Sequence, residues 1–193
     1  MQDTLALTAE ARLYVEWTVF ADTRALMPNA ADQQAFYREM QIQLRGQDHV
    51  FLELINEAGH ATQQCNPSAF AKPEGLISSH GSGLTDVPPP SPFWDYATYH
   101  ARRNPYPSPK SFTNWNAYVF RDGDPFPLPC PFICEEGLKP EQYAFNPVYA
   151  RLMGQGAQVS GGGTFHHSAW NEARLWTAQE RACAEAFYQG LRG

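Results

Sequence analysis

The sequence predicts an α/β fold built on a parallel sheet. Segments rich in β-branched and aromatic residues, which favour strands, alternate with segments whose apolar residues recur at helical spacing. Two strand-like segments, 50–57 and 131–137, also end a hydrophobic run in a carboxylate. Strands that alternate with helices are typical of a parallel sheet, in which the strand carboxyl ends share one edge. We therefore expect these carboxylates to lie at the same edge.

The amino-terminal elements are a helix and a strand. Residues 1–11 have a helical pattern, and residues 13–20 are rich in β-branched and aromatic types, which predicts a strand with Trp17 in the core. A longer helix is predicted over 29–45, because Asn29 is a good capping residue and Gly46 ends the pattern. Its apolar residues recur every four positions and should face the core: Phe36, Met40 and Leu44.

The remaining elements are mostly strands. After the strand 50–56 we expect a short helix near residues 68–70, and then a closing helix over 178–191 that packs inward through Ala182, Ala186 and Leu191. Short apolar or β-branched runs predict the other strands at 76–80, 95–100, 132–135 and 158–165. With no internal repeat and no second domain apparent, residues 1–193 are predicted to form one domain.

Composition excludes several classes of protein. The chain has 193 residues, with 43% hydrophobic and 18% charged residues, as expected of a folded domain. Its net charge of −6 disfavours a nucleic-acid partner, whose phosphates require a basic face. No apolar run approaches the roughly 20 residues of a membrane span. The four cysteines suggest neither a zinc knuckle nor a disulfide framework, and no cofactor is implied.

The run 51–57, FLELINE, resembles the fourth-strand signature of clan A glycoside hydrolases, the cellulase-like barrels. That signature reads apolar-Glu-apolar-x-Asn-Glu, usually followed by Pro, where this chain has Ala58. The resemblance implies that Glu57 is the general acid/base and that Asn56 contacts the sugar hydroxyl beside the reacting carbon. Glu53 would be a buried strand residue held by hydrogen bonds.

The run 131–137, PFICEEG, resembles the seventh-strand segment that carries the nucleophile in the same family. Two alignments are open, one that selects Glu135 and one that selects Glu136. Successive strand side chains point to opposite faces, so a regular strand directs only one of the two into the site. We favour Glu136 as the nucleophile, because its distance from Pro131 and its place before the turn match better.

Two weaker resemblances follow in the same order as in the family. Residues 96–100 resemble a sixth strand that ends in a site histidine, His100. Residues 161–166 resemble an eighth strand, with His166 where many members have a stacking Trp and Trp170 nearby as a substitute. Aromatic side chains could form stacking walls for sugar rings, and the candidates are Trp94, Tyr99, Trp115 and Trp170.

The resemblance implies a (β/α)8 TIM barrel that is incomplete, with about strands three to eight present and an amino-terminal truncation. It also implies a retaining glycosidase that cleaves a β-linked glycan with two carboxyl groups. The partner would be a carbohydrate substrate, and the compartment and the oligomeric state are not predicted. The amino terminus has no signal-peptide pattern.

Two other functions remain open. A metal-dependent hydrolase on the same barrel would use His and Asp ligands at strand ends, and the candidates are Asp22, His60, His80, His100, His166 and His167. No His-x-His pair occurs at a strand end, which disfavours this reading. An incomplete barrel could also be a carbohydrate-binding remnant without activity, because missing strands leave the carboxylates less rigidly held.

Overall fold

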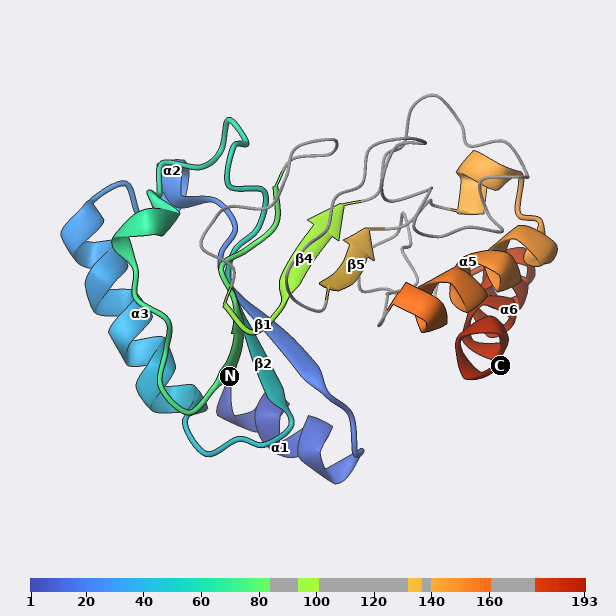
Figure 1. Ribbon diagram of the computed structural model, residues 1–193, viewed down its shortest axis with the longest axis horizontal. Helices are drawn as coiled ribbons and strands as arrows, with labels where there is room; N and C mark the ends of the chain where they lie inside the picture. Colours follow the sequence, from blue (N-terminus) through green and yellow to red (C-terminus); the bar gives the residue numbers. More distant parts are fainter. Residues whose placement is uncertain (84–93, 101–131, 137–139, 161–175) are drawn as a thin grey trace. The chain divides into compact units, whose positions relative to one another are not determined.

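The computed structural model describes residues 1–83, 94–100, 132–136, 140–160 and 176–193 (Figure 1). The chain divides into two compact units, residues 1–98 and 99–193, which are considered separately below. The first unit contains the parallel sheet, and the second contains a helical hairpin. The prediction that residues 1–193 form one domain stays a prediction.

The first unit follows the predicted alternation of strands and helices. Its elements are α1 (Gln2–Glu10), β1 (Val15–Phe20), α2 (Thr23–Leu26), α3 (Ala30–Leu44), β2 (Val50–Ile55), the 3₁₀ helix η1 (Pro67–Ala69) and β3 (Ile77–Ser79). The strand β4 (Ala97–His100) begins in this unit and continues into the second. Every strand predicted between residues 13 and 100 is confirmed, with no end shifted by more than two residues.

The strands pair in chain order, with β2 in the centre of a three-stranded parallel sheet. The register places Thr18 of β1 and Ser79 of β3 on either side of Glu53 of β2. A further parallel bridge joins Ser79 to Tyr96, which directly precedes β4. Because paired residues of neighbouring strands point to the same face, this register gathers polar side chains around Glu53.

The helix α3 covers one face of the sheet (Figure 1). Asn29 caps it, since its Oδ1 accepts a hydrogen bond from the Ala31 N–H at 2.8 Å. The buried residues of α3 are Gln33, Tyr37, Met40 and Leu44, and its apolar members share a core cluster with Leu52 and Leu54 of β2. The predictions that Met40 and Leu44 face the core are confirmed, whereas the prediction of a buried Phe36 is wrong, because the buried face passes through Tyr37 and leaves Phe36 37% exposed.

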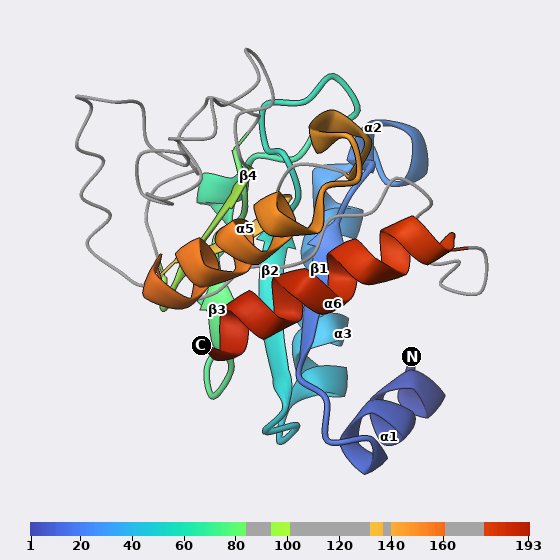
Figure 2. The ribbon, with the colours of Figure 1, turned by 90° about the vertical axis from the view of Figure 1, so that its right-hand side faces the viewer.

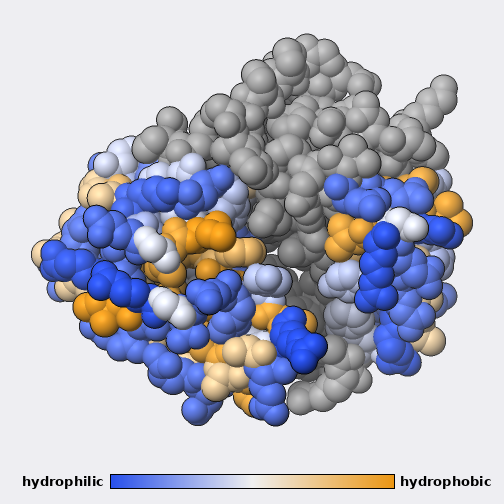
Figure 3. Space-filling view, turned by 60° about the horizontal axis from the view of Figure 1, so that its bottom comes forward, coloured by the Kyte–Doolittle hydropathy of each residue, from blue (hydrophilic) through white to orange (hydrophobic). Residues whose placement is uncertain are grey.

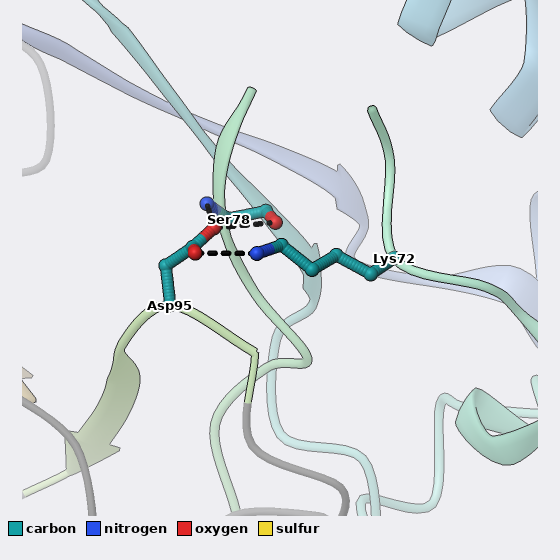
Figure 4. A network of polar contacts seen from close by, with 3 residues as sticks. All are labelled: Lys72, Ser78 and Asp95. Carbon is teal, nitrogen blue, oxygen red and sulfur yellow. Dashed lines mark hydrogen bonds and ion pairs between the residues drawn. The ribbon is translucent and has the colours of Figure 1, made fainter. Parts of the chain in front are cut away.

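A polar cluster fastens the start of β3 to the segment before β4 (Figure 4). Asp95 accepts hydrogen bonds from the backbone N–H of Ser78 at 3.0 Å and from its hydroxyl at 3.3 Å, and it pairs with Lys72 at 2.5 Å. Burial raises the pKa of Asp95, but the bonds from Lys72 and Ser78 outweigh burial and hold the pKa below its ordinary value. The ionised carboxylate therefore stabilises this junction.

The second unit contains β5 (Phe132–Glu136), the 3₁₀ helix η3 (Pro140–Tyr143), α5 (Pro147–Ser160) and α6 (Ala178–Arg192). The predicted strand at residues 132–135 and the closing helix are confirmed. The predicted strand 158–165 is wrong over residues 158–160, where α5 continues, and its remainder lies outside the described residues. Asn146 starts α5, because its Oδ1 accepts from the Val148 N–H at 3.0 Å and Pro147 has no N–H to satisfy.

Two glycines allow α5 and α6 to lie in close contact, side by side (Figure 2). A Cβ atom at Gly154 would overlap the carbonyl oxygen of Phe187, and one at Gly190 would overlap that of Arg151. The buried residues of α6 are Glu180, Cys183, Ala184, Ala186, Phe187 and Gly190. Ala186 was therefore predicted correctly to face inward, whereas Ala182 is exposed.

The viewed surface is mainly polar, with small separate hydrophobic patches (Figure 3). None of the helices in the described part of the chain has the length and apolar character needed to cross a membrane.

The strand order bears on the fold class. A singly wound parallel sheet keeps its strands in chain order, and β1, β2 and β3 do so. The connection from β1 to β2 contains α3, whereas the connection from β2 to β3 contains only η1. A (β/α)8 barrel needs more strands and closure, so the barrel stays a prediction.

Candidate functional site

The candidate site lies at the carboxyl end of β2, the central strand of the first unit. Asn56 and Glu57 follow this strand directly, as the sequence predicts. The Asn56 N–H donates to the carbonyl oxygen of Phe20 at 2.9 Å, which continues the β1–β2 pairing by one residue. The side chains of Asn56 and Glu57 are both half-buried. The sheet therefore fixes the backbone position at which Asn56 and Glu57 follow β2.

The segment after β3 closes over the turn after β2. The Ser82 N–H donates to the Ile55 carbonyl oxygen at 3.0 Å, and the Ser82 carbonyl accepts from the Ala58 N–H at 2.9 Å. The Ser82 hydroxyl accepts from the Glu57 N–H at 2.9 Å and donates to Asn56 Oδ1 at 3.2 Å. Ser82 therefore contacts every residue from Ile55 to Ala58, and it defines the shape of this turn.

The backbone of Glu57 adopts the left-handed conformation, with φ of 50°. Non-glycine residues adopt this conformation infrequently, and it costs on the order of 1 kcal/mol. The hydrogen bonds that the Glu57 and Ala58 N–H groups donate to Ser82 compensate for that strain. Strained backbone of this kind is concentrated at functional sites, because it directs a side chain where regular structure would not.

The sequence analysis missed another polar group at this edge of the sheet, the side-chain amide of Gln63. Its Nε2 donates to the carbonyl oxygens of Ala21 at 2.9 Å and Asn56 at 2.7 Å, and its Oε1 accepts from the Thr23 hydroxyl at 3.0 Å. This buried amide thus joins the carboxyl ends of β1 and β2. No local motif distinguishes Gln63 from Gln64 beside it, so sequence reasoning had no signal for it.

Below the strand ends lies a buried carboxyl group, Glu53, which is 1% exposed. The Thr18 hydroxyl donates to its Oε2 at 2.8 Å, and the Thr98 hydroxyl donates to its Oε1 at 2.7 Å. The nearby Ser82 hydroxyl also lowers the pKa of this carboxyl group. The expectation that Glu53 is a buried strand residue held by hydrogen bonds is therefore confirmed.

Burial and the nearby negative charge of Glu16 raise the pKa of Glu53 from 4.5 to about 7, and the neighbouring hydroxyl groups of Thr98, Thr18 and Ser82 only partly offset this rise. Glu16 lies on β1, and its Oε1 accepts a hydrogen bond from the Tyr96 hydroxyl at 2.5 Å. Glu53 therefore changes its charge near neutral pH, where an ordinary carboxyl group is fully ionised.

The raised pKa of Glu53 predicts a stability that depends on pH. Between pH values near 4.5 and 7 the folded protein binds more protons than the unfolded chain, so the free energy of unfolding falls as pH rises through this window. The total fall should be about 3 kcal/mol, at about 1.4 kcal/mol per pKa unit. The Glu53→Gln variant, which cannot ionise, should lose this dependence and be the more stable protein above about pH 7.

Urea denaturation of both proteins across the pH series measures this effect. A Glu16→Gln variant is the control, because removal of the neighbouring charge should lower the pKa of Glu53 and narrow the window without removing it. An unchanged pH dependence in Glu53→Gln would show that another group is responsible.

The predicted nucleophile lies in the second unit. Glu135 and Glu136 are the last two residues of β5, which is one residue longer than predicted, and Glu136 ends the strand. His100 is likewise the last residue of β4. Glu136 and His100 both end strands, as expected. The side chains of Glu135, Glu136 and His100 lie outside the described part of the structure. Their roles stay predictions.

The other predicted aromatic and histidine contacts fall into two groups. Trp94 is partly buried, packs against the core of the first unit and has its ring 4.9 Å from that of His80. His166, Trp170 and Trp115 lie outside the described residues. A stacking role for Trp94 would therefore use only the part of the indole that the core leaves uncovered.

Three of the residues proposed as metal ligands have described side chains, and each makes a structural contact: His80, His60 and Asp22. His80 is buried, with Nε2 2.7 Å from the Pro67 carbonyl oxygen. The exposed His60 has Nδ1 2.8 Å from the Thr62 hydroxyl, and the Asp22 carboxylate caps α2. Within the described ranges, no three His, Cys, Asp or Glu side chains lie together as a metal site would require.

Comparison with known proteins finds no family model that matches this chain, no similar curated protein and no similar solved structure.

Proposed function

We propose that this protein is a retaining glycoside hydrolase that cleaves a β-linked glycan. The observation that carries the proposal is the position of Asn56 and Glu57, side by side at the carboxyl end of the central strand of a parallel sheet. Parallel-sheet enzymes place catalytic side chains at this edge. The strained backbone of Glu57 is held by the hydrogen bonds that the Glu57 and Ala58 N–H groups donate to Ser82, so the backbone position from which this carboxyl group extends is fixed.

In the proposed reaction Glu57 is the general acid/base. It donates its proton to the glycosidic oxygen while Glu136 attacks the anomeric carbon, which forms a glycosyl-enzyme and releases the leaving group as an alcohol. Glu57 then removes a proton from water, which attacks the same carbon and releases the sugar with its original configuration. Asn56 contacts the sugar hydroxyl beside that carbon, and His100 holds the nucleophile in place.

The layer below the turn supports the proposed chemistry. The charge of Glu16 and, above about pH 7, that of Glu53 add negative potential on the face of the sheet that contains Thr18 and Thr98. Negative potential favours the positive charge that develops on the sugar in the transition state.

The test uses the full chain and a panel of aryl β-glycosides. We expect aryl alcohol release with at least one sugar, and an NMR time course should show that the β-anomer of the sugar forms first. First formation of the α-anomer would refute the retaining mechanism. Absence of hydrolysis across the panel, with a folded protein, would refute the proposed activity and favour a binding remnant.

A further inference from the structure

A groove on the exposed side of α6 takes no part in the proposed cleavage. Its volume is about 470 Å³, within the range of roughly 300–1,000 Å³ that small-molecule sites have. The α6 residues that line it recur at helical spacing and so form one stripe along the helix: Arg181, Ala184, Glu185, Tyr188, Gln189 and Arg192. Trp176, which directly precedes the capping residue Thr177, completes the described lining. The groove therefore lies within the second unit.

The packing of α6 explains why a groove forms along this stripe. The backbone of α6 lies against α5 at Phe187 and Gly190, and the stripe is on the other side of the helix. Within the stripe Ala184 is small and 6% exposed, whereas the residues beside it are long and exposed. Long side chains around a short buried one leave a depression, and the alanine forms its floor.

The groove has an excess of positive charge in an acidic protein. Its described lining has two guanidinium groups, of Arg181 and Arg192, and one carboxylate, of Glu185, whereas the whole chain has a net charge of −6. Arg181 donates through Nη1 to the Trp176 carbonyl oxygen, which holds this guanidinium near the amino end of the helix. In the described part of the chain neither guanidinium forms an ion pair with Glu185. All three charges therefore remain available to a ligand.

Aromatic side chains supply the apolar part of the lining. Tyr188 is 44% exposed, and its ring lies edge-to-face with that of Phe187, with centroids 5.4 Å apart and planes at 86°. This contact restricts the Tyr188 ring without covering it. The half-buried Trp176 adds a second ring system. A partly exposed ring provides an apolar surface against which the C–H face of a sugar can pack.

We propose that this groove binds a uronic acid residue of a β-linked glycan. The sugar carboxylate pairs with the guanidinium of Arg192, whose planar set of N–H donors matches the two oxygens of a carboxylate. The sugar ring packs on Tyr188, and a ring hydroxyl donates to the carboxylate of Glu185. The choice of a glycan as ligand rests on the proposed function, and the groove narrows the substrate class to acidic glycans.

The balance of charge favours a carboxylate over a phosphate. One excess positive charge, two minus one, matches the single negative charge of a uronic acid, whereas a phosphate monoester carries up to about two. The additional negative charge would lie in the same groove as the Glu185 carboxylate and be repelled by it. Glu185 instead favours a ligand with hydroxyl groups, because an ionised carboxylate can only accept hydrogen bonds.

Isothermal titration calorimetry of the full chain tests the inference with two tetrasaccharides of the same β-linkage, one of glucuronic acid and one of glucose. We expect the acidic tetrasaccharide to bind about tenfold or more tightly, because the neutral sugar cannot form the charge-assisted bonds. The difference should decrease as salt is added. Equal affinity for the two sugars would overturn the inference, and so would displacement of the acidic sugar by an equal concentration of inorganic phosphate.

Two positions on α6 test the assigned contacts. Arg192→Gln should weaken binding of the acidic tetrasaccharide about tenfold or more, and Arg192→Lys should restore only part of the loss, since an ammonium group lacks the planar fork. Tyr188→Ala should weaken binding of both sugars about two- to tenfold. Unchanged affinity for the acidic sugar in Arg192→Gln would reject the groove as its site.

Arg151→Gln is the matched control, because Arg151 is an exposed arginine of α5 that is not among the lining residues of the groove. Both arginines are exposed, so neither replacement should change the free energy of unfolding by more than about 0.5 kcal/mol. The affinity for the acidic sugar should be unchanged in Arg151→Gln. A loss equal to that in Arg192→Gln would show that only the overall charge of the second unit matters, which would overturn the site.

This inference and the proposed enzyme activity can fail separately. No groove residue takes part in the proposed cleavage, and binding is measured without turnover. Binding through Arg192 without cleavage of any glycoside would reject the proposed hydrolase and keep the binding site. Cleavage of aryl glycosides without binding of the acidic tetrasaccharide would reject the binding site alone.

Discussion

Replacement of Gly81 by alanine should destabilise the first unit by about 4 kcal/mol or more, close to the whole stability of a small domain. Gly81 has φ of +127°, a conformation that side chains rarely allow. An added Cβ would overlap the carbonyl oxygen of Ile55 and lie 2.6 Å from Ile55 Cγ2. Ile55 ends the central strand, so strand pairing prevents it from moving aside.

Chemical denaturation of the full chain measures this loss, and two other glycines provide matched controls. Gly46 and Gly75 also have positive φ, at 78° and 71°, but a Cβ at either would meet no atom within 4 Å. Alanine at these positions should cost only about 1 kcal/mol, the conformational part of the effect. A Gly81→Ala protein as stable as the two controls would show that the segment after β3 can move away from β2.

The same close approach is what creates the candidate site. Because Gly81 lies against Ile55, the next residue, Ser82, is brought within hydrogen-bond distance of Asn56 and Glu57. If the Gly81→Ala protein still folds, its turn at Glu57 should therefore also be disturbed. The sequence contains no motif that pairs residues 81–82 with 55–57, since the contact is 25 residues apart and depends on the parallel β2–β3 register.

Sequence patterns were informative where a local rule decides the structure. The strand β2 and the helix α3 were both predicted closely, because one is an uninterrupted apolar run and the other has a capping Asn29 and a clear helical period. The position of Glu57 after a strand follows from the same run. The burial of Glu53 was expected from a resemblance to a family motif, and the structure confirms it.

Local sequence rules failed where tertiary contacts decide which residues form a helix or face the core. Gly154 and Gly156 disfavour a helix by propensity, yet α5 runs through both, because Gly154 lets α6 pack against its backbone. Phe36 is more hydrophobic than its neighbours, but the buried face passes through Tyr37, whose hydroxyl donates to the Ala71 carbonyl oxygen at 2.8 Å. A buried tyrosine needs such a partner, and no sequence pattern identifies it in advance.

The Glu57→Gln variant should lose about 10²–10⁴-fold in kcat/KM, the usual contribution of a general acid/base. The loss should depend on the leaving group. A poor leaving group needs a proton from Glu57, whereas a nitrophenolate leaves without one, so nitrophenyl glycosides should lose less in the first step. Kinetic comparison of an alkyl and a nitrophenyl glycoside of the same sugar measures this difference.

Glu74→Gln is the matched control for that experiment, since Glu74 is an exposed carboxylate near the amino end of β3 and therefore away from the strand carboxyl ends. Glutamine has nearly the same size as glutamate, so neither variant should change the free energy of unfolding by more than about 1 kcal/mol. An equal loss for both leaving groups would indicate a distorted turn rather than a missing proton. Full activity in Glu57→Gln would show that Glu57 is not the general acid/base. The proposed reaction has no other proton donor at the end of β2, so the variant should not be able to make this proton transfer.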